Sequence, residues 1–223
     1  MSKSFRFEKA TLAAHAGLVS AIAFSPNGDK LASVSDDRTL KIWDLASFRL
    51  DRTLFCGRSL SDVAFAPDGT MVACTTVTGQ LLLWSTLNWK LLVGEIIESE
   101  VIGGSHPVRF MPDGKTVVLG GFGITLVDVG TGREQRAVFK EDLAFDRVAS
   151  IALSSDGALL VSAGVETGAI VVWDATSWRR LRTLFSNPFL FQGKQYGAGI
   201  WGVSLSPDGQ VLASGGKDDV ARL

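Results

Sequence analysis

The side chains that most often carry catalysis or bind metals are few in this sequence and far apart. The chain has two histidines, His15 and His106, and two cysteines, Cys56 and Cys74. His106 precedes Pro107 with no cysteine or second histidine nearby, which is more typical of a surface or strand-end residue than of a metal ligand. Neither histidine has a recognisable catalytic-triad context. We therefore predict no catalytic residue, no metal site and no cofactor.

The tetrapeptide DGKT at 113–116 resembles the end of a phosphate-binding loop, but the rest of that motif is missing. The motif needs a glycine five residues before Gly114, and Arg109 stands there. Such a site also needs a helix N-terminus, whereas the flanking sequence predicts a hairpin of two strands. Acidic residues are scattered through loops, so a carboxylate pair for glycoside hydrolysis would require the fold to bring distant loops together.

Composition and charge argue against several classes of partner. The 223-residue chain has a net charge of −1, and its densest basic stretch, WRRLR at 178–182, alternates with apolar residues as a surface strand does. Without a basic stripe, we predict no nucleic-acid partner. No apolar run approaches the roughly 20 residues of a spanning helix, and no signal peptide is visible. We therefore predict no membrane partner. Since there are only two cysteines, which we expect to be buried and reduced, we also predict a cytoplasmic location.

The elements that would position a site are defined by an internal repeat. A turn tetrapeptide recurs as SPNG (25–28), APDG (66–69), MPDG (111–114), SSDG (154–157) and SPDG (206–209), with glycines spaced 41, 45, 43 and 52 residues apart. Proline presets φ at the second turn position, and the final glycine takes the left-handed conformation. Each turn lies between two short apolar runs, such as VSAIAF and KLASVS, and therefore joins two strands.

A third and a fourth run follow each pair, for example TLKIWDL (39–45) and FRLDRTLF (48–55) in the first unit. Each unit is thus predicted to be a four-stranded antiparallel sheet. Several strands are apolar on both faces, so both faces of each sheet must be covered. Sheets stacked radially in this way form an all-β propeller, of which about five units are visible, the last incomplete.

The first unit, AAHAGLVSAIAFSPNGDKLASVSDDRTLKIWD, resembles a WD repeat, with His15 near its start and Trp43-Asp44 at its end. The resemblance covers nearly the whole chain. It implies a structural hydrogen-bonded set within the blade, which here would be His15, Ser33, Asp37 and Trp43. Other units keep parts of this set: Trp84 in the second, Ser162 and Trp173 in the fourth, and Ser214 and Asp218 in the fifth. In the second unit, Cys74 and Thr78 stand where the first has Ser33 and Asp37, and in the third Val127 replaces the tryptophan.

The resemblance also implies a rigid, non-enzymatic platform that binds other proteins through one rim. The loops between fourth and first strands, and between second and third strands, would form that rim. Arginine and aromatic residues are enriched at binding hot spots. The candidate partner-binding residues in these loops are Asp36, Arg38, Arg58, Phe122, Phe145, Arg147, Glu166 and Lys217. A small-ligand or glycan-binding propeller and a propeller hydrolase are the alternatives.

The least regular stretch is SNPFLFQGKQYGAG at 186–199, which we predict to be a loop. It adds Phe189, Phe191 and Tyr196 to the candidate partner-binding residues. Exposed, these side chains would form a partner site, whereas folded back they would fill the gap between blades. Both alternatives stay open at this point.

We predict one partial propeller domain over 1–223. A lone N-terminal strand within 1–14 would close the ring, and the blades would span 15–57, 58–100, 101–143, 144–190 and 191–223. Aligning GGKDDVARL with VSDDRTLKI places Leu223 opposite Ile42, inside a third strand. Because the commoner ring in the family has seven blades, we expect that missing blades or a partner cover two apolar end faces.

Overall fold

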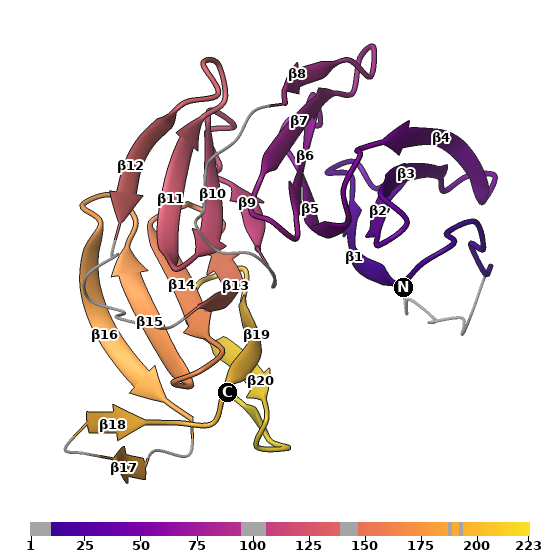
Figure 1. Ribbon diagram of the computed structural model, residues 1–223. Coiled ribbons are helices and arrows are strands. Elements are labelled where there is room, and N and C mark those ends of the chain that lie inside the picture. Colours follow the sequence, from indigo (N-terminus) through magenta and orange to yellow (C-terminus); the bar gives the residue numbers. More distant parts are fainter. Residues whose placement is uncertain (1–9, 95–105, 139–146, 187–188, 192–193) are drawn as a thin grey trace, which may run out of the picture.

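The computed structural model describes residues 10–94, 106–138, 147–186, 189–191 and 194–223, and every regular element among them is a β-strand. The strands form four antiparallel sheets of four strands, one of three, and a short hairpin. The five larger sheets follow one another along an arc, with first strands on the inner side and fourth strands on the outer side (Figure 1). The predicted all-β architecture of antiparallel blades is confirmed.

The strands divide among the blades in chain order. The first blade comprises β1 (Val19–Phe24), β2 (Lys30–Ser35), β3 (Thr39–Asp44) and β4 (Arg49–Phe55). The second comprises β5 (Leu60–Phe65), β6 (Met71–Thr76), β7 (Leu81–Ser85) and β8 (Leu91–Val93). The third comprises β9 (Val108–Phe110), β10 (Thr116–Gly121), β11 (Gly123–Asp128) and β12 (Glu134–Val138). The fourth comprises β13 (Val148–Leu153), β14 (Leu159–Gly164), β15 (Ala169–Asp174) and β16 (Arg179–Phe185). After the hairpin of β17 (Phe189–Phe191) and β18 (Lys194–Tyr196), the fifth comprises β19 (Ile200–Leu205), β20 (Leu212–Gly216) and β21 (Ala221–Arg222).

The repeated tetrapeptide forms the turn between first and second strands in all five blades. Its glycine N–H donates to the carbonyl of the first turn residue, for example Gly28 to Ser25 at 2.9 Å and Gly209 to Ser206 at 2.8 Å. The same glycines have φ of +73° and +69°, which side chains with a Cβ rarely adopt. The repeat in the sequence is therefore a repeat of backbone geometry.

Each junction between consecutive blades contains its own cluster of buried apolar side chains. Between the first two blades, for example, Val34 and Ile42 pack with Leu60 and Val72. Comparable clusters fill the other three junctions. Burial of apolar area between sheets is therefore distributed evenly along the arc, and it stabilises each blade through its neighbours.

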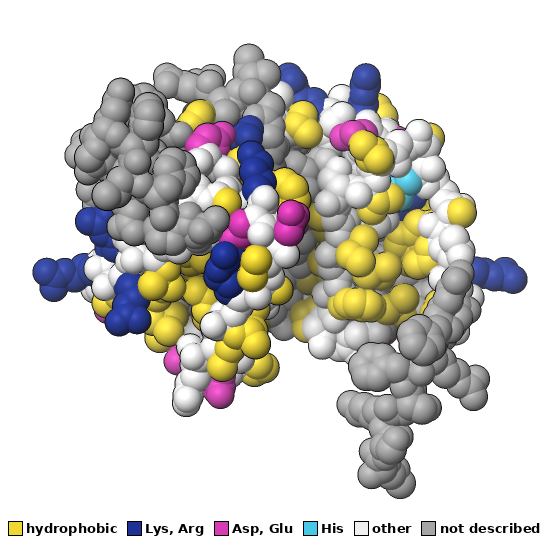
Figure 2. Space-filling model, turned by 90° about the horizontal axis from the view of Figure 1, so that it is seen from below, with side chains coloured by type: hydrophobic (Ala, Val, Ile, Leu, Met, Phe, Trp, Pro, Cys, Tyr) yellow, Lys and Arg dark blue, Asp and Glu magenta, His cyan; other side chains and the backbone are white. Residues whose placement is uncertain are grey.

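The two end blades each leave one apolar face uncovered. Val19, Ile22 and Phe24 of β1 are 51%, 60% and 65% exposed, whereas Leu60 and Val63, at the positions of Val19 and Ile22 in the second blade, are 0% and 2% exposed. Hydrophobic side chains gather on the lobe that contains β1–β4, at the right of Figure 2. The last blade exposes Trp201, Val211, Val220 and Leu223.

One irregular segment differs from the expectation, and a second lies mostly outside the described residues. The predicted loop at 186–199 contains the β17–β18 hairpin, in which Phe189 is paired with Tyr196. Its Phe-Leu-Phe run has high β-propensity, which explains the strand. The predicted N-terminal strand lies mostly outside the described residues, and 10–14 are not in a strand.

Candidate functional site

The rim loops of all five blades are joined by the same backbone hydrogen bond. In each blade, an N–H at the end of the second strand or just after it donates to a carbonyl in the loop before the first strand. The donor and acceptor pairs are Asp36 and Leu18 (3.0 Å), Val77 and Ser59 (3.0 Å), Gly120 and Pro107 (2.9 Å), Val165 and Arg147 (3.0 Å), and Lys217 and Gly199 (2.9 Å). The rim is thus a regular backbone frame, and only its side chains vary from blade to blade.

The predicted partner-binding residues of the described loops lie on this frame. Phe122 is 48% exposed and forms the tip of its turn, because its neighbours Gly121 and Gly123 face each other across β10 and β11. Arg147 is half-buried, and its guanidinium lies 3.7 Å from the Glu166 carboxylate. The exposed members are Asp36, Arg38, Arg58, Phe122, Glu166 and Lys217. Phe145 lies outside the described residues.

The β17–β18 hairpin joins the same rim. Directly after β18, the Gly197 N–H donates to the carbonyl of Thr167, next to Glu166. The Ala198 N–H donates to the carbonyl of Ser186 at 3.1 Å. The hairpin that carries Phe189, Phe191 and Tyr196 is therefore tied at its base to the rim of the fourth blade.

A chain of side-chain hydrogen bonds supports the rim in the first blade. The Trp43 indole N–H donates to Ser33 Oγ at 2.8 Å, and Ser33 Oγ lies 2.7 Å from His15 Nε2. His15 Nδ1 lies 2.8 Å from Asp37 Oδ2. Because the carboxylate can only accept, His15 Nδ1–H donates to it; the Ser33 oxygen accepts from the indole, and its hydroxyl hydrogen is free to donate to Nε2. The four residues that the resemblance implied are brought together in one network.

Asp37, the carboxylate of this network, accepts several further hydrogen bonds. Besides His15, it accepts hydrogen bonds from the Ala16 N–H at 2.9 Å, the Thr39 N–H at 3.0 Å and the Thr39 hydroxyl at 2.6 Å. Burial opposes ionisation, but the hydrogen bonds from Thr39, Ala16 and His15 outweigh it and hold the pKa of Asp37 well below its ordinary value. The carboxylate therefore fixes a rim turn to the incoming loop.

The other blades keep this network only in part. In the fourth, the Trp173 indole N–H donates to Ser162 Oγ at 3.0 Å. In the fifth, Asp218 is paired with Arg222. In the second, Cys74 stands in place of the serine and is fully buried, while Cys56 is only half-buried, so the expectation that both thiols are buried was wrong for Cys56.

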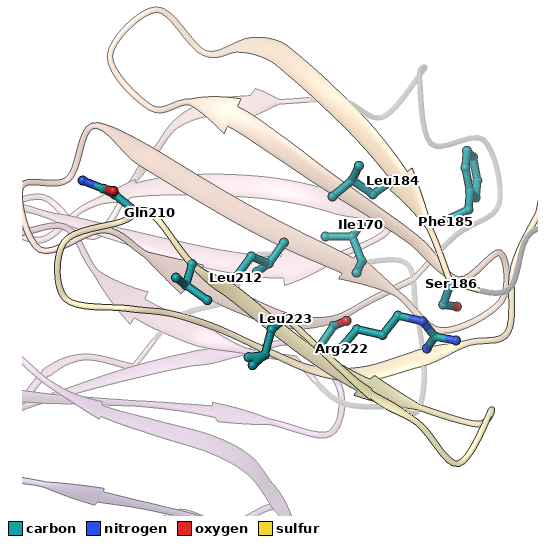
Figure 3. Close-up of a pocket in the computed structure, with 10 residues that line it drawn as sticks. Ile170, Leu184, Phe185, Ser186, Gln210, Leu212, Arg222 and Leu223 are labelled. Atoms are coloured by element: carbon teal, nitrogen blue, oxygen red, sulfur yellow. The ribbon is translucent and has the colours of Figure 1, made fainter.

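A cavity of about 590 Å³ lies between the outer strands of the fourth and fifth blades. Apolar side chains from both blades, including Ile170, Leu184 and Leu212, point into it, with Arg222 at one end (Figure 3). Ser214 also lines the cavity, at the position that Ser162 has in the fourth blade. The lining suits an apolar or aromatic group with one hydrogen-bonding atom.

His106 lies at a strand end, as one of the two predicted alternatives has it, but the other alternative, a surface residue, was wrong. It is 2% exposed, just before β9, at the junction between the second and third blades. Its N–H donates to Ser61 Oγ at 3.1 Å, and its carbonyl accepts from the Thr75 hydroxyl at 2.5 Å. Its Nδ1 lies 3.3 Å from the Gly120 carbonyl, and Nε2 has no hydrogen-bond partner within the described ranges. Two side chains from the preceding blade thus hold the main chain of the histidine at this junction.

This burial predicts a pH dependence of stability. Burial, with a smaller effect from the charge of Arg147, lowers the pKa of His106 below its usual 6.5. The unfolded chain therefore binds a proton that the folded chain does not. The contribution of His106 to stability should be complete above about pH 6.5 and should decline as the pH falls. Urea denaturation at about pH 7.5 and about pH 5.5 should show a smaller loss for His106→Gln than for the wild type. Equal losses in both proteins would contradict this.

Neither a metal site nor a membrane span is found where the structure is described. No three His, Cys, Asp or Glu side chains of those residues group together as metal ligands would. None of those residues forms a helix long and apolar enough to cross a bilayer.

Four-stranded antiparallel sheets packed side by side, with their first strands along the inside of an arc, define a protein of the β-propeller class. The chain belongs to the WD40 repeat family: the family model "WD domain, G-beta repeat" matches residues 7–44, 135–174 and 188–223, about half of the chain. The resemblance drawn from the sequence is thereby confirmed.

Several curated proteins are similar to this chain. Nuclear distribution protein PAC1 of Arthroderma benhamiae is 29% identical over 218 residues, which are 95% of this chain and 36% of that protein. Small ribosomal subunit protein RACK1y of Oryza sativa is 31% identical over 172 residues, 74% of this chain and 50% of that protein. A Periodic tryptophan protein 2 homolog of Neurospora crassa is 30% identical over 128 residues, 14% of its length. The chain thus spans half or less of these relatives.

Proposed function

We propose that the chain is part of a non-enzymatic, cytoplasmic scaffold or regulatory platform that binds other proteins through its rim. The observation that carries the proposal is the backbone hydrogen bond repeated in all five blades. It holds the incoming loop of each blade against the end of that blade's second strand, so a partner would meet a preorganised surface and would not have to order it on binding. The rice relative is by name a component of a ribosomal subunit, which supports a role in assemblies.

Two rim residues combine exposure with the chemistry of hot spots. Phe122 is half exposed at the tip of a turn, and Arg58 is exposed in the loop before β5. An aromatic ring gives a large rigid contact area, and a guanidinium gives planar, directional hydrogen bonds. We expect these two residues to contribute more to partner affinity than the acidic members Asp36 and Glu166.

Quantitative affinity capture with the whole chain tests the proposal. We expect Phe122→Ser and Arg58→Glu each to reduce the recovery of the same set of proteins by about tenfold or more, since hot-spot residues are worth at least ~1–2 kcal/mol. The matched control is Leu87→Ser, because Leu87 is 91% exposed in the turn between β7 and β8, at the opposite edge of the sheet. Equal loss in the control, or no loss in either rim variant, would contradict binding through the rim.

A small-ligand or glycan-binding function has one observation in its favour, the cavity between the fourth and fifth blades. Its volume falls in the range of small-molecule sites, but its mostly apolar lining suits an apolar ligand better than a sugar. Binding to a glycan array without capture of any protein would favour this alternative. A hydrolase would require turnover that disappears when a central acidic residue is replaced.

A further inference from the structure

Two thiols, one in the segment that leads from the first blade to the second and one in the second blade, stand at the positions of two hydrogen-bonded residues of the first blade. Gly28 and Gly69 of the repeated turns are 41 residues apart, and the same interval separates His15 from Cys56 and Ser33 from Cys74. The strand registers agree, because Ser33 lies opposite Lys41 in β3 as Cys74 lies opposite Leu82 in β7. Comparison of the repeat units by residue type matched Cys74 with Ser33 but did not match Cys56 with His15.

These two positions are in direct contact. In the first blade, the side-chain atoms His15 Nε2 and Ser33 Oγ are 2.7 Å apart. At the second blade, Cys56 packs against the same apolar cluster as Cys74, near enough for the Cys74 thiol to lower the pKa of Cys56, while the Cys56 thiol lies 3.7 Å from the Leu54 carbonyl. Trp84 Nε1 lies against the Cys74 sulfur, a weak acceptor, and has no other partner in the described part of the chain. The tryptophan of the network is kept, whereas cysteines stand at the positions of His15 and Ser33.

The two thiols belong to different blades and differ in access. Cys56 directly follows β4, the outer strand of the first blade, and its N–H donates to the carbonyl of Arg38 at 2.8 Å. It is half-buried, whereas Cys74 in β6 is 0% exposed. A small oxidant can therefore reach Cys56 before Cys74.

We propose that Cys56 and Cys74 form a peroxide-driven, reversible disulfide that locks the first blade to the second. The Cys56 thiolate attacks hydrogen peroxide, so that an S–O bond forms, the O–O bond breaks, and the released hydroxide takes up a proton to become water. The sulfur of Cys74 then attacks the sulfenic acid of Cys56, so that the S–S bond forms and the oxygen leaves as a second water with the Cys74 proton. Two thiols lose two electrons and the peroxide gains them. A dithiol reductant reverses the reaction.

The ionisation of the pair favours this order of events. The hydrogen bond from the Cys74 thiol lowers the pKa of Cys56, while that contact and complete burial raise the pKa of Cys74. The first proton therefore leaves the accessible thiol, and the thiolate is the form that reacts with peroxides. Cys74 keeps its proton until the sulfenic acid has formed beside it.

Peptide mapping of the full chain tests the proposal. Trypsin cleaves after Arg52, Arg58 and Lys90, so Cys56 and Cys74 fall in separate peptides, 53–58 and 59–90. After treatment of the folded chain with a small molar excess of hydrogen peroxide, we expect these peptides to be linked and to separate on reduction with dithiothreitol. The oxidised chain should melt roughly 5–10 °C higher than the reduced chain, because the bond closes a short loop across a blade junction.

Two matched variants separate the disulfide from other oxidation. In Cys74→Ser, which restores the serine of the first blade, Cys56 should be trapped as a sulfenic acid by dimedone. In Cys56→Ser, Cys74 should stay unmodified for as long as the protein is folded, as circular dichroism would verify. Overoxidised Cys56 beside an alkylatable Cys74 in the wild type, or disulfide-linked dimers only, would overturn the proposal. Oxidation of Cys74 in folded Cys56→Ser would also overturn the assigned order.

Discussion

Replacement of Trp173 by alanine should lower the free energy of unfolding by about 3–5 kcal/mol. The indole is 0% exposed in the cluster between the third and fourth blades, and its N–H donates to Ser162 Oγ. Truncation removes a large apolar surface from the core and leaves a cavity that flanking strands cannot fill without bending. It also leaves the hydroxyl of Ser162 without its donor. Urea denaturation followed by circular dichroism would measure the change.

The control for this substitution is Trp201→Ala. Trp201 is 61% exposed on the uncovered face of the last blade, so its removal should change the free energy of unfolding by less than about 0.5 kcal/mol. Both variants lose an indole, Trp173 from the third strand of the fourth blade and Trp201 from the first strand of the fifth. A similar loss in both would mean that burial at the blade junctions is not what stabilises the arc.

Replacement of Asp37 by alanine should cost about 2–4 kcal/mol. Its side chain is 10% exposed and accepts hydrogen bonds from His15, Ala16 and Thr39. Without the carboxylate, these donors are left unpaired next to the buried Ser33 and Trp43. The adjacent Asp36 has an exposed side chain, so Asp36→Ala should change stability by less than about 0.5 kcal/mol.

The Asp37 effect should also depend on pH. Because the pKa of this carboxyl is lowered in the folded state, its contribution is complete above the ordinary value of 3.8 and is lost as the pH falls through the lower, folded-state pKa. The difference in stability between wild type and Asp37→Ala should therefore be constant near neutral pH and should shrink in acid. A difference that grows as the pH falls would contradict the assigned role of the carboxylate.

The blade architecture could be predicted from sequence because it rests on local backbone chemistry. A glycine such as Gly28 at the end of each turn marks a positive φ, and the turn fixes the two strands beside it. The tryptophan, serine, histidine and aspartate of the first blade could be named because the unit resembles a WD repeat, and that resemblance implies that the four side chains bond to one another. Both inferences need only residues close in sequence or at a fixed interval.

What could not be predicted depends on contacts between units. His106 is buried at a junction between blades, where Ser61 and Thr75, which lie 45 and 31 residues away in the chain, bind its main chain from the preceding blade. Cys56 was missed as the counterpart of His15 because a comparison by residue type does not match a thiol with an imidazole. The positional interval would have found it. Exposure of the rim side chains likewise follows from packing, which no local pattern encodes.

The hydrogen bonds that frame the rim have a consequence for how such a surface can change. Both partners are main-chain groups, so the hydrogen bond itself needs no particular side chain except that the donor is not proline. At the acceptor even proline serves, as Pro107 shows opposite Gly120 at 2.9 Å. Glycine is required where the loops approach closely: a Cβ at Gly120 would lie 2.6 Å from Pro107, and one at Gly199 would overlap the Val165 carbonyl. The exposed residues of the rim can therefore be exchanged one at a time without moving the loops that carry them. New binding specificities are thus reachable by single substitutions, in evolution or in the laboratory, without redesign of the fold.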